Sequence, residues 1–397
     1  MACVRKSLIV VLLSAPCWAL AQHHATDVRP SVVPSRPALA VGAALDTDGK
    51  IWLAQVKDGH VFVASSEDGG TRFGKPVQVT PVPESIAADG ENRPKIAIAA
   101  DGVVVLTWTQ ALPQKYSGNI RFARSVDGGD TFSKPITLND DGRITSHRFD
   151  SLAVDGKGRV AVAWLDARDR DAAKEKGGTY PGVSVYIAQS KDSGAQFDAN
   201  RRLVEHVCEC CRTGMTWSRE GPVVFWRNLF DKNTRDFSIG WLDSGEVRRA
   251  TDDEWKIDAC PHHGGGIAAD GNGVLHLVWF TQGKTRQGLF YKRIDGQIES
   301  PAMALGNPAA QAGHPGVAAA GSTVVLTWRE FNGRAYVVQA MRSDDGGASW
   351  TPPMLLAESV GAADYPVPLT DGKRALVIWN AAVEGLRVLP VETGAKR

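Results

Sequence analysis

The chain has 397 residues and is nearly neutral, with 45 Lys and Arg against 44 Asp and Glu and a formal net charge of +1. A neutral chain without a basic run gives no electrostatic reason to expect nucleic acid or an anionic membrane surface as a partner. Beyond the first 21 residues, no apolar run approaches the length that a membrane-spanning helix needs. A small molecule, a glycan or a metal ion is therefore the kind of ligand to look for.

The first 21 residues have the pattern of a secretory signal peptide. Arg5 and Lys6 form a short basic region, Leu8 to Leu13 form an apolar run, and Ala19 to Ala21 form a cleavage site of small residues. We expect cleavage before Gln22 and export to the periplasm or the medium, an oxidising compartment in which disulfides persist.

One pattern recurs along the whole chain: a turn with Gly or Asp-Gly, followed by an apolar run that ends in tryptophan. The copies end at Trp52, Trp108, Trp164, Trp226, Trp279, Trp328 and Trp379. Short β-runs at this spacing, without helical periodicity, predict an all-β fold, a β-propeller of four-stranded blades. The seven copies favour seven blades over six.

The two ends of the chain are expected to close this ring. The last unit, from Tyr365 to Val391, has room for only three strands. The N-terminal segment 22–35 includes Thr26 to Val33, which can supply the fourth strand. The propeller domain itself is expected over residues 36–397.

A second motif, Ser-x-Asp-x-Gly-x-x-aromatic, runs in phase with the first. Complete copies occupy residues 66–73, 125–132, 190–197 and 343–350, and eroded copies stand at 241–245 and 293–296. Asp accepts hydrogen bonds from nearby backbone N–H groups and Gly takes a positive φ, so the motif predicts a hairpin turn with the aromatic side chain packed beneath it.

These segments resemble the Asp-box (BNR) repeats of the sialidase-like propeller superfamily, and the resemblance covers nearly all of the chain after the signal peptide. It implies that the Asp boxes lie on the face opposite the active site. Sialidases have six blades and surround the substrate carboxylate with three arginines, beside a Tyr nucleophile and an Asp acid–base. The matching candidates are Arg93, Arg148, Asp150, Arg212 and Tyr365. The family's Arg-Ile-Pro motif is absent, and Asn92-Arg93-Pro94 is its nearest analogue.

The loops leading into the innermost strands of a propeller converge on one face near the central axis. In this chain they contain the segments 36–37, 93–94, 147–150, 208–212, 260–263, 314–315 and 365–366. Their Arg, His, Cys and Tyr residues predict a polar ligand-binding funnel, for which Arg36, His147, His314 and Arg329 are the further candidates. Two charged loops, 166–178 and 227–235, should overhang the same face.

Two of these loops carry the four cysteines that lie outside the signal peptide. Cys208, Cys210 and Cys211 stand in one loop, and Cys260, His262 and His263 in the loop of the following blade. A disulfide from the first loop to Cys260 would close about 50 residues and contribute roughly 4 kcal/mol. Thiolates and imidazoles together also suit a soft metal, copper or zinc.

The start of the mature chain favours copper over zinc. Gln22-His23-His24 offers a free amine, two amides and a third-position His, a nitrogen set that suits copper(II). The leading interpretation is thus an exported propeller with a metal-binding or disulfide-stapled Cys/His site at the axial mouth. An exo-glycosidase of the sialidase type and a non-catalytic carbohydrate- or protein-binding propeller are the alternatives.

Overall fold

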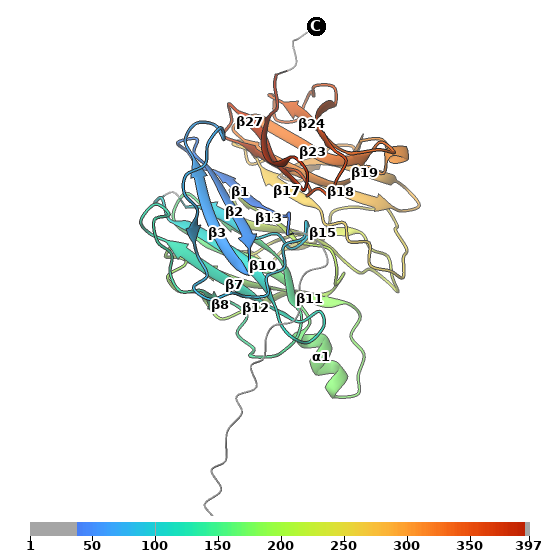
Figure 1. The fold of residues 1–397 in the computed structure, drawn as a ribbon. Helices are drawn as coiled ribbons and strands as arrows, with labels where there is room; N and C mark the ends of the chain where they lie inside the picture. Colours follow the sequence, from blue (N-terminus) through green and yellow to red (C-terminus); the bar gives the residue numbers. More distant parts are fainter. Residues whose placement is uncertain (1–37, 100, 394–397) are drawn as a thin grey trace, which may run out of the picture. The chain divides into compact units, whose positions relative to one another are not determined.

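The computed structural model describes residues 38–99 and 101–393, which form seven antiparallel sheets arranged in a ring (Figure 1). The innermost strands contact one another in cyclic order, and the ring closes where β1 (Gly42–Leu45) contacts β26 (Val367–Thr370). The protein is therefore a seven-bladed β-propeller, as the spacing of the sequence repeat predicts. The signal peptide, Arg36 and the expected closing strand 22–35 lie outside the described residues.

The blades follow one another along the chain, with strands numbered from the inside outward. Blade one continues with β2 (Ile51–Lys57), β3 (His60–Ser66) and β4 (Val77–Gln78), and blade two contains β5 (Lys95–Ile98), β6 (Val104–Ala111), β7 (Gly118–Ser125) and β8 (Ile136–Thr137). Blade three contains β9 (His147–Val154), β10 (Val160–Asp166), β11 (Val183–Ser190) and β12 (Arg201–Val207), and blade four β13 (Gly214–Ser218), β14 (Gly221–Arg227), β15 (Phe237–Trp241) and β16 (Val247–Arg249).

The remaining blades have the same order. Blade five contains β17 (Gly266–Ala269), β18 (Leu275–Gln282), β19 (Gln287–Asp295), β20 (Ile298–Glu299) and the short strand β21 (Met303–Leu305), which also pairs with β19. Blade six contains β22 (Gly313–Ala320), β23 (Thr323–Phe331), β24 (Tyr336–Ser343) and β25 (Met354–Ser359). Blade seven adds β27 (Ala375–Ala381) and β28 (Gly385–Pro390) to β26, three strands within the described part.

Buried tryptophans on the second strands fill the space between blades. Six of the seven repeat tryptophans are fully buried: Trp108, Trp164, Trp226, Trp279, Trp328 and Trp379. Trp52 occupies a different position. Ile51 and Val104 each pair with the Ser that opens a Ser-x-Asp turn, so they mark equivalent positions in blades one and two. Trp52 stands one residue after this position, whereas Trp108 stands four residues after it. The blade count is confirmed, but the first tryptophan is not equivalent to the other six.

The four Ser-x-Asp turns share one hydrogen-bond pattern. In blade two, Ser125 Oγ donates to Asp127 Oδ1 at 2.7 Å and accepts from the Gly129 amide at 2.8 Å. A Cβ placed on Gly129, whose φ is +92°, would lie 2.7 Å from the ring of Trp52 in blade one. Each turn therefore does more than reverse the chain, because the glycine at its fifth position lets it pack directly on the preceding blade.

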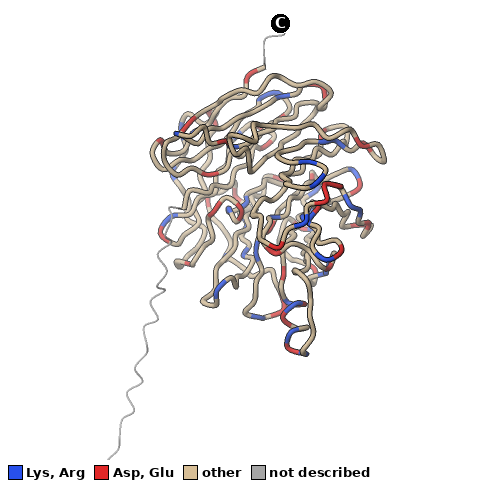
Figure 2. The backbone as a smooth tube through the Cα atoms, turned by 90° about the vertical axis from the view of Figure 1, so that its right-hand side faces the viewer, with Lys and Arg blue, Asp and Glu red and all other residues tan. Residues whose placement is uncertain are grey.

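Connections in these blades alternate between two faces. The turns from first to second and from third to fourth strand lie on one face, called the turn face here, and the other connections lie on the loop face. The predicted charged loop 166–178 belongs to the loop face and contains a short helix, α1 (Arg168–Glu175), which stands out from the ring in Figure 1. A 3-10 turn, η1 (Pro308–Ala310), lies in the connection that leads into β22 of blade six. Figure 2 shows Lys and Arg intermixed with Asp and Glu over the propeller.

Candidate functional site: a cysteine cluster and an axial carboxylate

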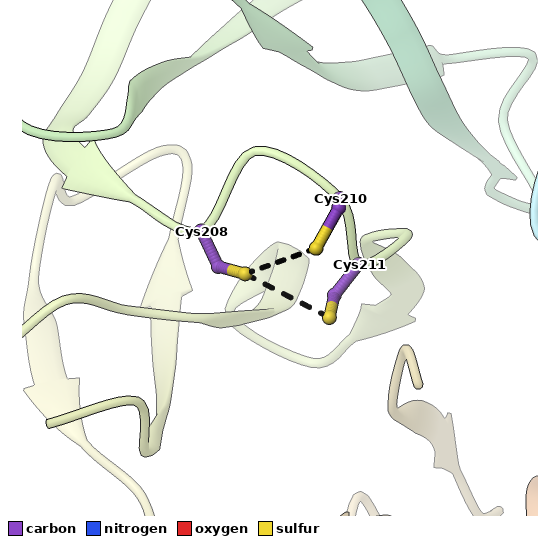
Figure 3. A group of neighbouring side chains, drawn as sticks. All are labelled: Cys208, Cys210 and Cys211. Carbon is purple, nitrogen blue, oxygen red and sulfur yellow. Dashed lines mark hydrogen bonds between the residues drawn. The ribbon is translucent and has the colours of Figure 1, made fainter. Parts of the chain in front are cut away.

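Three cysteines in the connection from β12 to β13 turn their sulfur atoms toward one another (Figure 3). Sγ of Cys208 lies 3.6 Å from Sγ of Cys210 and 3.8 Å from Sγ of Cys211, and all three side chains are buried. These separations are far longer than an S–S bond of about 2.05 Å, and the four cysteines of the described part are free thiols. The loop thus brings three soft ligand atoms to one point.

A second group shares Cys210 with the first. The ligand atoms of Cys210, Cys260 and His262 lie within 4.8 Å of one another, and both Cys260 and His262 are exposed to solvent. The two stretches meet because they lead into β13 and β17, innermost strands of adjacent blades that contact each other. His262 takes part in this group, whereas the neighbouring His263 stacks on Phe280.

Two buried arginines cover the cysteine cluster. Arg235 Nη1 lies 3.0 Å from Sγ of Cys208, and its Nε donates to the carbonyl of Ile257. Arg227 is 1% exposed and donates to the carbonyls of Arg235, His263 and Phe280. Within the described residues neither guanidinium forms an ion pair with a carboxylate. Because buried charges need a counter-charge, the cysteine sulfurs are the anionic groups that this arrangement calls for.

The three thiols have unequal proton affinities. Hydrogen bonds shared with Cys210 and Cys211 hold the pKa of the Cys208 thiol well below its usual range, and Arg227 and Arg235 act in the same direction. The hydrogen bond to Cys208 raises the pKa of Cys210, and burial raises that of Cys211. The surroundings therefore favour ionisation of Cys208 over ionisation of Cys210 and Cys211.

A buried carboxylate, Glu91, lies beside the cysteine loop at the centre of the ring. Arg212 Nη1 donates to Glu91 Oε1 at 2.7 Å, and the amides of Arg212 and Gly264 donate to Oε2 at 3.2 and 3.1 Å. His314 Nδ1 lies 3.4 Å from Oε1. Although burial opposes ionisation, Arg212 and His314 lower the pKa of Glu91 far below its usual range. Glu91 thus ties together loops from blades two, four, five and six.

A stack of rings extends from this carboxylate toward blade seven. His314 lies between His263 and Tyr365, with ring centroids 4.3 and 3.5 Å away. Burial lowers the pKa of His263 to about 3 and that of His314 to about 4, so both are neutral at neutral pH. The backbone of His314 has a φ of +54°, uncommon for a residue other than glycine, and this conformation sets the direction of its ring.

A cavity of about 350 Å³ opens beside the stack, between blades five and six. His263, Phe280, His314, Arg329, Glu330 and Tyr336 are among its lining residues. The Arg329 guanidinium lies over the rings of Tyr336 and Tyr365, at 4.4 and 4.8 Å from their centroids, and donates to the carbonyl of Ala363. Glu330 accepts hydrogen bonds from the Trp328 indole and the Asn307 amide. Among the described residues, Arg329 makes no ion pair.

The structure gives the arginines suggested by the sialidase resemblance different main partners, and it brings Arg93 to Tyr365, whose carbonyl accepts from Arg93 Nη2 at 3.3 Å. Arg93 forms a bidentate pair with Asp364, at 3.0 and 3.1 Å, and Arg212 is held by Glu91. The Arg148 guanidinium lies over the ring of Phe149. Burial raises the pKa of Tyr365 to about 12, which opposes its ionisation as a nucleophile.

Asp150 and His147 are buried in polar networks. Asp150 accepts from Lys95 at 3.1 Å and from Thr107 at 2.6 Å. His147 Nε2 lies 3.1 Å from Asp141 Oδ1, and its Nδ1 lies 2.7 Å from the carbonyl of Gly118. Neither side chain reaches solvent, since both are 0% exposed. These contacts hold blade three in place against blade two.

Sequence reasoning missed three residues that shape the site. Glu91 stands two positions before Arg93, just outside the segment taken as the start of the inner strand. Arg227 and Arg235 bound the charged loop that was expected only to overhang this face. For the two arginines, the sequence offers one signal: the nearest acidic residues are Asp231 and Asp236. Asp236 pairs with Arg249 and is therefore not the counter-charge of either arginine.

Comparisons with known proteins support the fold. No protein-family model matches the chain, and no curated protein matches it. Among solved structures, a polysaccharide lyase of family PL25, an ulvan lyase, is 12% identical, with a TM-score of 0.53 and coverage of 89% of this chain and 92% of that chain. The polysaccharide lyase Uly1 is 11% identical, with a TM-score of 0.50 and coverage of 88% and 90%.

At this level of identity the likeness is one of fold. The chain is a seven-bladed β-propeller that carries a buried cysteine cluster on its loop face. In the described part, no helix is long and apolar enough to cross a membrane.

Proposed function

We propose that this propeller binds a soft metal ion, copper(I) ahead of zinc, through Cys208, Cys210 and Cys211. The main support is the convergence of three buried sulfur atoms, with Sγ of Cys208 lying 3.6 Å from that of Cys210 and 3.8 Å from that of Cys211. A tetrahedral metal with metal–sulfur bonds of about 2.3 Å places its sulfur ligands about 3.8 Å apart. The separations between the sulfur atoms in this structure are therefore close to those that a bound ion requires.

The charge around the cluster favours copper(I). Three thiolates with copper(I) carry a net charge of −2, which the guanidinium groups of Arg227 and Arg235 balance. The same thiolates with zinc(II) carry −1 and leave one positive charge in excess. Soft thiolate ligands also select copper(I) among the first-row metals.

A direct test is a titration of the reduced, tag-free mature chain with copper(I) in competition with bicinchoninate under nitrogen. We expect one tightly held copper per chain in the wild-type protein. Cys208→Ser should weaken binding by several kcal/mol, because it removes one of three ligands. Thr213→Ser keeps a hydroxyl in the same buried loop and should bind copper as the wild type does.

The disulfide alternative makes a different prediction for the same protein. A bridge to Cys260 would leave two titratable thiols or none in the native, unreduced chain, and its loss in Cys260→Ser would lower thermal stability without any effect on metal binding. If the reduced wild-type protein holds no copper or zinc, the metal proposal is wrong and the staple becomes the function of the cluster.

A second candidate function is supported by the cavity beside Arg329. Its mixture of aromatic rings, neutral histidines and a guanidinium without an ion pair suits a carbohydrate that carries a carboxylate, since Arg binds carboxylates in a bidentate manner. The lyase structures to which the fold is similar are described as acting on polysaccharides. Calorimetry with glucuronate and glucose tests this, and Arg329→Gln should remove any preference for the acid.

The exo-glycosidase alternative has less support from the contacts. Arg93 and Arg212 already have carboxylate partners, and freeing either would leave Asp364 or Glu91 buried and unpaired. Turnover of a fluorogenic sialoside that is abolished by Tyr365→Phe would establish this activity.

A further inference from the structure

We propose that Cys260 and His262 receive the metal ion first and pass it to the buried cysteines through Cys210. This inference rests on the metal site proposed above and concerns the route by which the site is filled. Its basis is a shared ligand: Cys210 belongs both to the group with Cys208 and Cys211 and to the group with Cys260 and His262.

The two groups differ in access to solvent. Cys208 and Cys211 are each 1% exposed, whereas Cys260 and His262 lie at the surface. An ion carried by a donor molecule therefore cannot reach Cys208 or Cys211 directly. It can reach the exposed pair, and Cys210, although only 4% exposed, has its sulfur within 4.8 Å of the ligand atoms of both.

The backbone at His262 is a second, independent observation. His262 has a φ of +52°, in the left-handed region that residues other than glycine rarely occupy. Such conformations cost free energy and persist where the surroundings hold them, often at functional sites. Here the conformation accompanies the placement of the imidazole beside Cys210 and Cys260, while His263 next to it points into the aromatic stack.

The transfer is a ligand exchange without a change of oxidation state. Copper(I) would first bind the sulfurs of Cys210 and Cys260 and a nitrogen of His262, as its bonds to the donor break and the two thiols release their protons to water. Cys208 and Cys211 then form bonds to copper as the bonds to Cys260 and His262 break, while Cys210 stays bound. Cys211 gives up its thiol proton and Cys260 takes one up, so the exchange is balanced in charge and in protons.

The experiment compares the rate of loading with the final affinity. The reduced mature chain is mixed in a stopped-flow instrument with the copper(I)–bicinchoninate complex, and the loss of the complex's colour is followed. Cys260→Ser and His262→Asn should each slow loading about tenfold and leave the equilibrium affinity unchanged within about threefold. Asn is chosen because it tolerates a positive φ. His206→Asn is the matched control, since the His206 side chain is 45% exposed and its backbone has a φ of +60°.

The outcomes separate this inference from the metal site itself. If both variants load as fast as the wild type, the route is wrong and the site stands. If Cys260→Ser loses as much affinity as Cys208→Ser, the sulfurs form a single four-ligand site and the two-step route is wrong. If the wild type takes no copper from the complex at equilibrium, the proposed function fails.

Discussion

The guanidinium of Arg235 lies 3.0 Å from Sγ of Cys208, and both side chains are buried. A cation held against a sulfur in this way stabilises the thiolate over the thiol. Arg235 comes from the β14–β15 connection and Cys208 from the end of β12, so blade four supplies the charge for a ligand at the end of blade three. The relationship favours an anionic sulfur at this point of the cluster.

Replacing this cation should change the ionisation of the cluster. In Arg235→Gln, we expect the midpoint of the thiolate absorbance titration at 240 nm to rise by about one pH unit or more, because a nearby opposite charge no longer favours the thiolate. Arg334→Gln is the control, since Arg334 is exposed and pairs with Glu358. An unchanged midpoint in Arg235→Gln would mean that the arginine does not stabilise the thiolate.

Loss of the axial carboxylate should destabilise the propeller. Glu91→Gln leaves Arg212 buried without its counter-charge, and we expect the free energy of unfolding to fall by about 3–5 kcal/mol in urea denaturation. Because the pKa of Glu91 is lowered in the folded state, its contribution is present above the unfolded pKa and declines as pH falls below it. Glu358→Gln removes an exposed pair and should cost at most about 1 kcal/mol. Equal losses in the two variants would contradict this role for Glu91.

His314 should make the fold sensitive to mild acid. Burial lowers its pKa from 6.5 to about 4, so below pH 6.5 the unfolded chain binds a proton that the folded chain does not. Stability is therefore complete above pH 6.5, and we expect a loss of about 2–3 kcal/mol by pH 4.5. In His314→Asn this part of the pH dependence should disappear, whatever the variant's stability at pH 7.5. A slope identical to that of the wild type between pH 6.5 and 4.5 would exclude His314 as its source.

The packing of a Ser-x-Asp turn on the preceding blade can be tested at adjacent glycines. Gly129→Ala should lower the free energy of unfolding by about 2–4 kcal/mol, because the new methyl group meets Trp52 in addition to the cost of a positive φ. Gly128 also has a positive φ, of +72°, but open space around its Cβ position, so Gly128→Ala should cost only about 1–2 kcal/mol. Thermal unfolding that fails to separate the two variants would argue against an inter-blade contact at this turn.

Much of the fold could be predicted because its signals are local and repeated. The turn before each second strand and the Ser-x-Asp-x-Gly motif each depend on a few adjacent residues, so their spacing reveals the blades. Trp52 misled the alignment of blade one: it ends an apolar run as the other tryptophans do, yet its indole donates to Asp46 in the turn at the start of β2. Only strand pairing distinguishes these two positions.

The site could be predicted only in part, because partners far apart in sequence decide it. That two cysteine loops meet follows from their places in adjacent blades. The pairing of Arg93 with Asp364, 271 residues away, and of Arg212 with Glu91, 121 residues away, does not follow from any local pattern. These pairings give two of the candidate arginines carboxylate partners within the protein. Positive φ values accompany the side-chain directions of His262 and His314.

The central claim is that the buried sulfurs hold a soft metal, and the X-ray absorption spectrum of the reduced chain loaded with one equivalent of copper(I) tests it most directly. The account predicts a first coordination shell made of sulfur in the wild-type protein and a smaller sulfur shell in Cys208→Ser. A shell of nitrogen and oxygen atoms, or a spectrum unchanged by Cys208→Ser, would contradict it.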